Sequence, residues 1–160
     1  MIRRAAVLAC LFLIAAWGVA CAAAPCADDS GQASLRQMQV FLDGDGTRHA
    51  LAVEVADSAQ ERARGLMCRR ALATDSGMLF IYPEETLARM WMKDTLLALD
   101  MLFIASDGRI VKVVEHTQAL SEDWVEAKQP VRYVLELKAG SARRLGLKTG
   151  DRLRLESHNR

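Results

Sequence analysis

Apolar and polar residues alternate over short stretches from residue 35 onward. Met38, Val40 and Leu42 are separated by more polar neighbours, and residues 49–55 alternate again after the run DGDG at 43–46. A period of two is typical of a half-buried strand, and a glycine-rich turn between two such strands is typical of a hairpin. The sequence therefore predicts that the domain begins with a β-hairpin.

Further short elements follow along the rest of the chain. Ser58 and Glu61 form the pattern of a capping box, which predicts a helix over 58–64 that ends at Gly65. A second short helix is predicted over 141–145, where Gly146 ends it. Strand-like runs cover 78–82, 88–93, 101–105, 110–116, 131–137 and 152–156. Many short strands with two short helices predict a mainly β (β-rich α+β) fold, a compact sandwich or squat barrel with the helices at its rim.

The N-terminus has the pattern of a secretion signal. Arg3 and Arg4 precede the apolar run 5–19, and the small residues Ala20 and Ala22 flank Cys21. We expect cleavage after Ala22, which divides the chain into a signal at 1–22, a flexible leader at 23–34 and a single β-rich domain at 35–157. The mature protein would be periplasmic or secreted.

Two alternatives would keep the N-terminus at a membrane. The apolar run is long enough to remain as an uncleaved anchor, or Cys21 could carry a lipid. Gly18 argues against the lipid, since a bulky apolar residue normally stands at that place in a lipoprotein signal. These two routes are the only contact with a membrane that the sequence predicts.

Charge and cysteine content change when the signal is removed. Loss of residues 1–22 takes Arg3 and Arg4 away, which leaves 19 basic against 20 acidic residues and a net charge of −1. No block of like charge remains, so we expect no binding to nucleic acid. Cys26 and Cys68 also remain and could form a disulfide. Because Cys26 lies in a polar leader, we favour two unpaired cysteines, with Cys68 half buried.

No metal or cofactor is predicted. The DGDG run lacks the further oxygen ligand, the placed glycine and the closing glutamate of a calcium loop. The methionines could suggest a copper(I) site, but each stands in an apolar strand context that favours core packing. The three histidines show no ligand spacing.

Several motifs occur in a fixed order in the middle of the chain. They are ERARGLM at 61–67, GMLF at 77–80, MWMKDT at 90–95, LDMLFI at 99–104, DG at 107–108, YVLEL at 133–137, Gly140, and GD at 150–151. Together they resemble the family called domain of unknown function 192, over residues 50–155. The resemblance implies a compact β-rich fold, often exported or membrane-tethered, with no established reaction or ligand.

One position departs from that family. The family usually has Asn after Trp-Met-Lys, whereas this chain has Asp94. Asn donates and accepts hydrogen bonds, and an ionised Asp only accepts. If this side chain donates to a ligand elsewhere in the family, the ligand or its protonation differs here.

The segment 90–100 carries the densest group of candidate binding residues. If 88–93 is a strand, Trp91 and Lys93 share one face and Met90 and Met92 the other. An exposed Trp with a cation beside it can form a surface on which a ligand packs, and Asp94 and Thr95 would add hydrogen-bonding side chains. The alternative is that Trp91 belongs to the core and that Lys93 forms a surface ion pair of little energetic weight.

A second candidate is an acid in an apolar strand. Glu136 points away from the expected core face, so it should either face solvent or pair with a cation. Arg62, Arg69 and Lys93 are possible partners, and structural pairing is favoured over ligand binding. The full set of candidate ligand-binding residues is Trp91, Lys93, Asp94, Thr95, Asp100, Arg69 and Glu136.

The function that follows is a binding function. The chain has no Gly-x-Ser-x-Gly elbow, His-Glu-x-x-His motif or Cys-His arrangement, and no catalytic residue is assigned. We expect an exported domain that binds a small polar ligand or an envelope partner without turnover. The alternative is a hydrolase or lyase that uses Lys93 with Asp94 or Asp100 as acid and base, so the question of enzymatic activity stays open.

Overall fold

The computed structural model describes Cys26 and residues 35–155. The predicted signal at 1–22, the cleavage site, the rest of the predicted leader and residues 156–160 lie outside the described residues. Within the described part, no helix has the length and apolar character needed to cross a membrane.

Strands dominate the described chain. In order they are β1 (Gln37–Gly44), β2 (Thr47–Ala56), α1 (Ala59–Arg64), β3 (Ser76–Thr86), β4 (Arg89–Met90), β5 (Leu99–Ile104), β6 (Ile110–Val114), β7 (Val125–Glu126), β8 (Val131–Lys138), α2 (Ser141–Arg144) and β9 (Arg152–Leu155). The predicted opening hairpin is β1 with β2, which pair in antiparallel register from Gln37 opposite Glu54 to Gly44 opposite Thr47.

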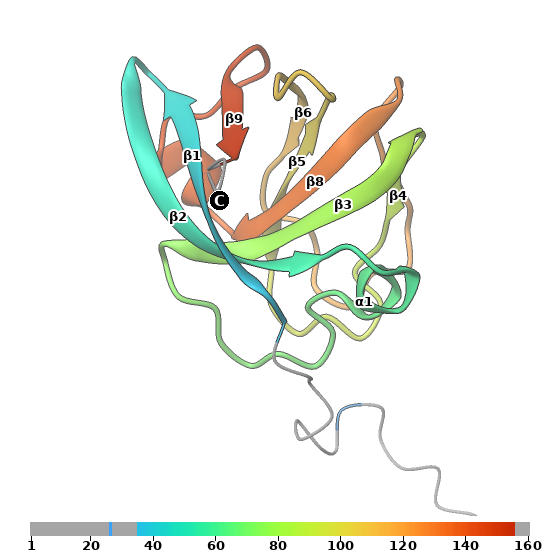
Figure 1. The fold of residues 1–160 in the computed structure, drawn as a ribbon. Coiled ribbons are helices and arrows are strands. Elements are labelled where there is room, and N and C mark those ends of the chain that lie inside the picture. Colours follow the sequence, from blue (N-terminus) through green and yellow to red (C-terminus); the bar gives the residue numbers. More distant parts are fainter. Residues whose placement is uncertain (1–25, 27–34, 156–160) are drawn as a thin grey trace, which may run out of the picture.

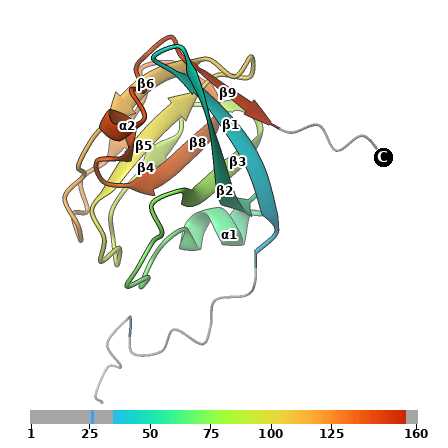
Figure 2. The same ribbon diagram turned by 90° about the vertical axis from the view of Figure 1, so that its left-hand side faces the viewer.

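One large sheet curls into a half-barrel (Figure 1). Its strand order is β6-β5-β8-β3-β2-β1-β9, and β2 with β3 form a parallel pair, joined through α1. The two edges approach each other where Arg109 bridges to Arg152 and the Leu153 amide donates to the Gly108 carbonyl at 2.8 Å. Figure 2 shows α1 and α2 at separate places around this sheet. The prediction of a mainly β fold with two short helices is confirmed.

Both faces of the sheet are buried. One apolar cluster includes Leu42, Leu79 and Leu135 together with Leu145 and Leu153. A second cluster, on the other face, combines side chains of β3, β5 and β8 with residues of the segments that cover them: Met78, Phe80, Met101, Phe103 and Val134 from the sheet, and Leu66, Met90, Met92 and Ala127 from the cover. Every residue of β5 is therefore buried. The same cover encloses Val134 and Glu136 of β8, which lie on this face of the sheet.

The predicted strand at 88–93 is much shorter than expected. Only Arg89–Met90 pairs, with the unpredicted strand β7. The chain turns directly afterwards, where the Thr95 amide donates to the Met92 carbonyl at 3.0 Å. Asp94 occupies this turn with φ 52°, a left-handed conformation that Asn and Asp adopt more readily than most other residues.

The first helix forms as predicted. The Ser58 hydroxyl accepts from the Glu61 amide at 3.2 Å, and the Glu61 carboxylate accepts from the Ser58 amide at 2.9 Å. Gly65 ends the helix at φ 49°, and a Cβ there would approach the Phe80 ring to 3.1 Å. A glycine thus lets the chain turn tightly against β3 and positions the residues that follow α1.

The expectation of two unpaired cysteines is wrong. Cys26 and Cys68 form a disulfide, with their Cα atoms 5.0 Å apart. Cys68 is held in place by its amide, which donates to the Asp94 carbonyl at 2.8 Å. The polar composition of the leader gave no sign that Cys26 returns to this loop, because the contact depends on residues far apart in the sequence.

Candidate functional site

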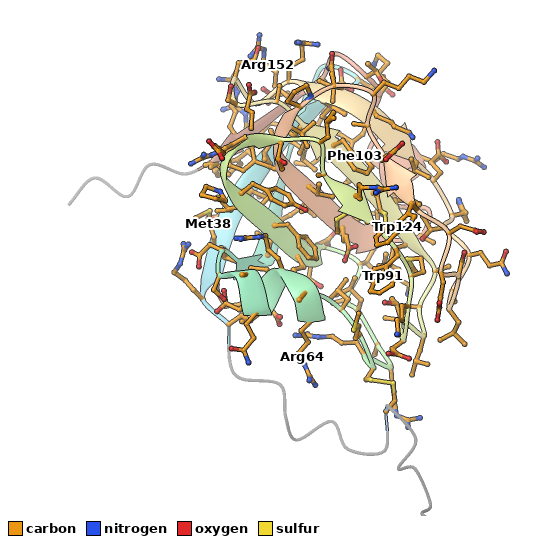
Figure 3. All side chains as sticks on the ribbon, turned by 90° about the vertical axis from the view of Figure 1, so that its right-hand side faces the viewer. Met38, Arg64, Trp91, Phe103, Trp124 and Arg152 are labelled. Carbon is orange, nitrogen blue, oxygen red and sulfur yellow. A yellow bond between two sulfur atoms is a disulfide. The ribbon has the colours of Figure 1, made fainter. Side chains whose placement is uncertain are left out.

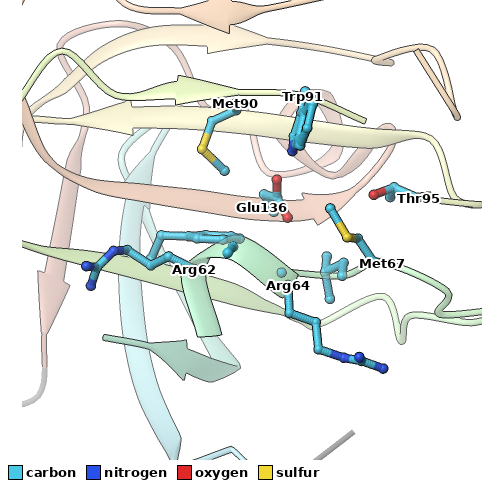
Figure 4. A pocket seen from close by; sticks show the side chains of 11 residues that line it. Arg62, Arg64, Met67, Met90, Trp91, Thr95 and Glu136 are labelled. Carbon is cyan, nitrogen blue, oxygen red and sulfur yellow. The ribbon is translucent and has the colours of Figure 1, made fainter. Parts of the chain in front are cut away.

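A small pocket lies between the end of α1, the segment 90–95 and the surface of β8 (Figure 4). Its lining includes Arg62, Arg64, Met67, Phe80, Met90, Trp91, Thr95 and Glu136. The cavity volume is about 20 Å³, which is room for about one water molecule. The pocket therefore has space for a single small group beside the buried residues of its lining.

Glu136 is the buried acid of this pocket. It lies in β8 between Met78 of β3 and Met101 of β5, and its exposed fraction is 4%. Among the described residues, none donates a hydrogen bond to its carboxyl group or forms an ion pair with it. Burial raises the pKa of Glu136 from 4.5 to about 8. The expectation that this acid faces solvent or pairs with a cation is wrong, because the second apolar cluster covers its face of the sheet.

Arg62 lines the pocket but is committed to other partners. Its guanidinium donates to the carbonyl oxygens of Asp57 and Ile81, the latter at 2.9 Å. It also lies over the Tyr82 ring, 5.3 Å from the centroid. These contacts hold the charge at the β3 side of α1.

Arg69 and Lys93, the other predicted partners, are held elsewhere. Arg69 forms an ion pair with Glu54 of β2, so it does not belong to the pocket. The Lys93 ammonium lies over the Trp91 ring, 5.3 Å from the centroid. All three cations proposed for Glu136 from the sequence thus contact other groups.

Trp91 forms one wall of the pocket and extends to the surface. Its ring stacks on Trp124 with centroids 5.0 Å apart and planes 7° apart (Figure 3). Arg89 lies over the Trp124 ring at 5.0 Å, so two cations flank the pair of rings. Met92, with 1% exposure, is buried and Trp91 is half-buried, as expected for their burial. Met90 and Trp91, however, line the same pocket and so do not lie on opposite faces of a strand.

Asp94 and Thr95 follow Trp91 in the tight turn. Thr95 is buried and lines the pocket, and its hydroxyl donates to the Lys93 carbonyl at 3.2 Å. Asp94 contributes its backbone, which accepts from Cys68. The left-handed backbone of Asp94 gives a conformational reason for the Asn that the family has here, beside the hydrogen-bonding reason considered from the sequence.

Asp100 lies away from the pocket. It is fully buried, and its two carboxylate oxygens accept from the amides of His116 at 2.9 Å and Ala142 at 2.8 Å. Its cross-strand neighbour is Leu137, whereas Glu136 pairs with Met101. Asp100 and Glu136 therefore project from opposite faces of the sheet, and Asp100 anchors the first turn of α2.

Several residues in or beside the pocket were not expected from the sequence. Met67, Phe80 and Met90 line the pocket but read as core residues. Trp124, which stacks on Trp91 outside the lining, stands alone in a polar run without periodicity. The motif ERARGLM contains Met67 and was the one signal that could have brought α1 to the site. Within the described residues, no group of three or more His, Cys, Asp or Glu side chains could hold a metal ion.

Comparison with known proteins places the chain in a family. Residues 40–155 match the family model DUF192, described as uncharacterized ACR. The chain belongs to the domain of unknown function 192 family. A comparison with curated protein sequences finds no match. The family assignment confirms the resemblance seen in the sequence motifs.

Two solved structures share the fold of this domain of unknown function 192 protein. A protein from Sinorhizobium meliloti 1021, provisionally described as a transcription regulator, is 47% identical, with a TM-score of 0.76 over 78% of this chain and 98% of its own. A protein of unknown function from Novosphingobium aromaticivorans DSM 12444 is 33% identical, with a TM-score of 0.74 over 83% of this chain and 94% of its own.

Proposed function

We propose that this protein is an exported domain that binds a small polar ligand at the Glu136 pocket, without turnover. The observation that carries the proposal is Glu136, a residue with 4% exposure whose carboxyl group has no hydrogen-bond partner among the described residues and borders the pocket beside Trp91. Burying such a group costs free energy unless something binds it. A ligand that supplies the missing contact would offset that cost.

The disulfide supports export. Disulfides persist in oxidising compartments and are rare in the cytosol, and Cys26–Cys68 joins the two cysteines that remain after the predicted cleavage. The signal pattern at 1–22 points to the same compartment. A periplasmic or secreted location accounts for both features.

Binding is favoured over catalysis by the state of the possible reactive groups. The Thr95 hydroxyl donates to a backbone carbonyl, and Asp100 uses both carboxylate oxygens to hold backbone amides. The acid–base pair of Lys93 with Asp100 is therefore a poor candidate, and the pair of Lys93 with Asp94 stays the enzyme alternative. Nucleic-acid binding, suggested by the name of the Sinorhizobium protein, does not suit a mature chain of net charge −1.

A ligand screen with a matched pair of variants tests this proposal. We expect some compounds from a set of amines, sugars, nucleotides and amino acids to raise the midpoint of thermal unfolding of the protein. Glu136→Gln should abolish that shift, whereas Glu84→Gln, which removes an exposed carboxylate, should leave it unchanged. Equal shifts in both variants would place the binding site elsewhere.

A further inference from the structure

The walls nearest Glu136 are rich in electrons, and the two arginines of the lining are directed elsewhere. Arg62 donates to the carbonyls of Asp57 and Ile81, and Arg64 is exposed and points away from Glu136 (Figure 4). The thioethers of Met67 and Met90 and the ring of Trp91 lie about the carboxyl group (Figure 4). Thioether sulfur is a weak acceptor, and the face of an indole ring attracts cations. The Thr95 hydroxyl already donates to the Lys93 carbonyl, so its proton is engaged outside the pocket. The group that this environment lacks is a cationic donor.

We infer that the pocket takes a primary ammonium group, which binds to the Glu136 carboxylate and lies against Trp91. This inference rests on the proposed function, because it names the chemical group of the same ligand. It also explains why Arg62, Arg69 and Lys93 are all held by other contacts. A cation of the protein's own on Glu136 would close the site to a ligand.

The size of the pocket selects among cations. Its volume of about 20 Å³ is near that of one water molecule, and an ammonium head is of similar size. A guanidinium carries three nitrogens around a carbon and needs more space, as does a quaternary ammonium with four carbon substituents. The remainder of the ligand must then lie outside the pocket.

The charge of Glu136 links binding to pH. Because burial raises its pKa to about 8, the free site holds a proton at neutral pH. An ammonium binds to the ionised form, so binding releases that proton. As the pH increases toward 8, the affinity should therefore rise by about tenfold per pH unit, and it should level off above pH 8.

The groups near Glu136 do not account for this dependence of affinity on pH, which we assign to Glu136 itself. Burial raises the pKa of Tyr82 on β3 above its ordinary value, so this phenol stays neutral at neutral pH. On α1, Arg62 donates to the Ile81 carbonyl and Arg64 is exposed, and Lys93 lies over Trp91. On β5 the cross-strand neighbour is Met101, which does not titrate.

The ammonium could belong to a free alkylamine or to the lysine side chain of a protein. Both present the same head group on a flexible apolar chain. We favour the free amine, and the two sources are separated by the probes. Methylammonium and n-butylammonium represent the free amine. Nα-acetyl-lysine amide represents the protein lysine, because acetylation of its α-amino group removes that charge and keeps the side-chain ammonium.

A titration of the purified protein with its disulfide intact tests the inference. Nuclear magnetic resonance follows the Trp91 indole N–H and the carboxyl carbon of Glu136 while methylammonium is added at constant ionic strength. We expect saturable shifts at both positions, no such response to methanol or tetramethylammonium, and an affinity about tenfold higher at pH 7 than at pH 6. Glu136→Gln should weaken binding at least tenfold, and Glu84→Gln should not.

Three results would overturn the inference. They are an equal response to methanol, an affinity that rises toward acid pH, and retention of methylammonium binding in Glu136→Gln. If neutral compounds bind at the pocket while amines do not, the ammonium assignment fails and the proposed function stands. If no compound in the screen binds in a Glu136-dependent way, both fail.

Discussion

At the scale of single residues, Glu136 has the largest consequence for stability. Its pKa is about 8 in the folded protein against 4.5 when unperturbed. Between these values the folded state keeps a proton that the unfolded chain has lost. The free energy of unfolding should then fall as pH rises, by about 1.4 kcal/mol per pH unit, and level off above pH 8. Urea unfolding across pH 5–9 should show this slope in the wild type and lose it in Glu136→Gln.

The same experiment carries its own control. Glu84→Gln removes an exposed carboxylate from β3 and should keep the wild-type dependence on pH. If the free energy of unfolding changes with pH by the same slope in the wild type and in Glu136→Gln, the buried carboxyl is ionised in the folded state throughout this pH range.

Trp91 and Met92 are adjacent residues with opposite roles. Met92 is buried in the second apolar cluster, so Met92→Ala should lower the free energy of unfolding by about 2–5 kcal/mol. Trp91→Ala removes a half-buried ring at the surface and should cost no more than about 1.5 kcal/mol, while it weakens ligand binding. Chemical denaturation of both variants measures the difference. A larger loss for Trp91→Ala would make that ring a core residue.

At the scale of elements, the turn after β4 fixes the shape of the pocket. Asp94 has φ 52°, a conformation that glycine adopts without strain and alanine does not. We expect Asp94→Ala to lower stability by about 1 kcal/mol and Asp94→Gly to leave it unchanged or slightly raised. Thermal unfolding of the two variants compares them directly. Equal losses would mean that the carboxylate, and not the backbone, is what the turn requires.

Local patterns predicted the local elements well. The capping box of Ser58 and Glu61 and the opening hairpin depend on neighbours in the sequence. Glu136 was misplaced for a long-range reason. Its strand has a core on both faces, and the residues that cover the second face, Leu66, Ala88, Met90, Met92 and Ala127, are distant from it in the sequence. Asp100 shows the same limit, since its partners Ala142 and His116 are distant in the sequence.

At the scale of the whole molecule, the disulfide ties the leader to the domain. Cys26 and Cys68 are separated by 42 residues, and closing a loop of this size limits the freedom of the unfolded chain. The double change of both cysteines to serine should lower the free energy of unfolding by about 2–4 kcal/mol. Dithiothreitol should lower the free energy of unfolding of the wild type by a similar amount and leave that of the double variant unchanged. A stability that is insensitive to reductant would contradict the crosslink.

Processing of the N-terminus is the second prediction at this scale. Because Ala20 and Ala22 occupy the positions that signal peptidase reads, the mature protein should begin at Ala23. Intact-mass measurement of material from the periplasm checks this. A mass that includes residues 1–22, or a diacylglycerol on Cys21, would show that the chain stays attached to the membrane.

The crosslink also sets the reach of the chain. Cys26 is fastened to Cys68, which directly follows Met67 of the pocket wall. Five residues lead from Cys21 to Cys26, and a fully extended chain of that length spans at most about 18 Å. In a protein held at the bilayer through Cys21, this short linker would keep the pocket within roughly one domain diameter of the lipid headgroups. In the cleaved protein only three residues would precede Cys26, which is bonded to Cys68 next to the pocket wall, so a purification tag belongs at the other end of the chain.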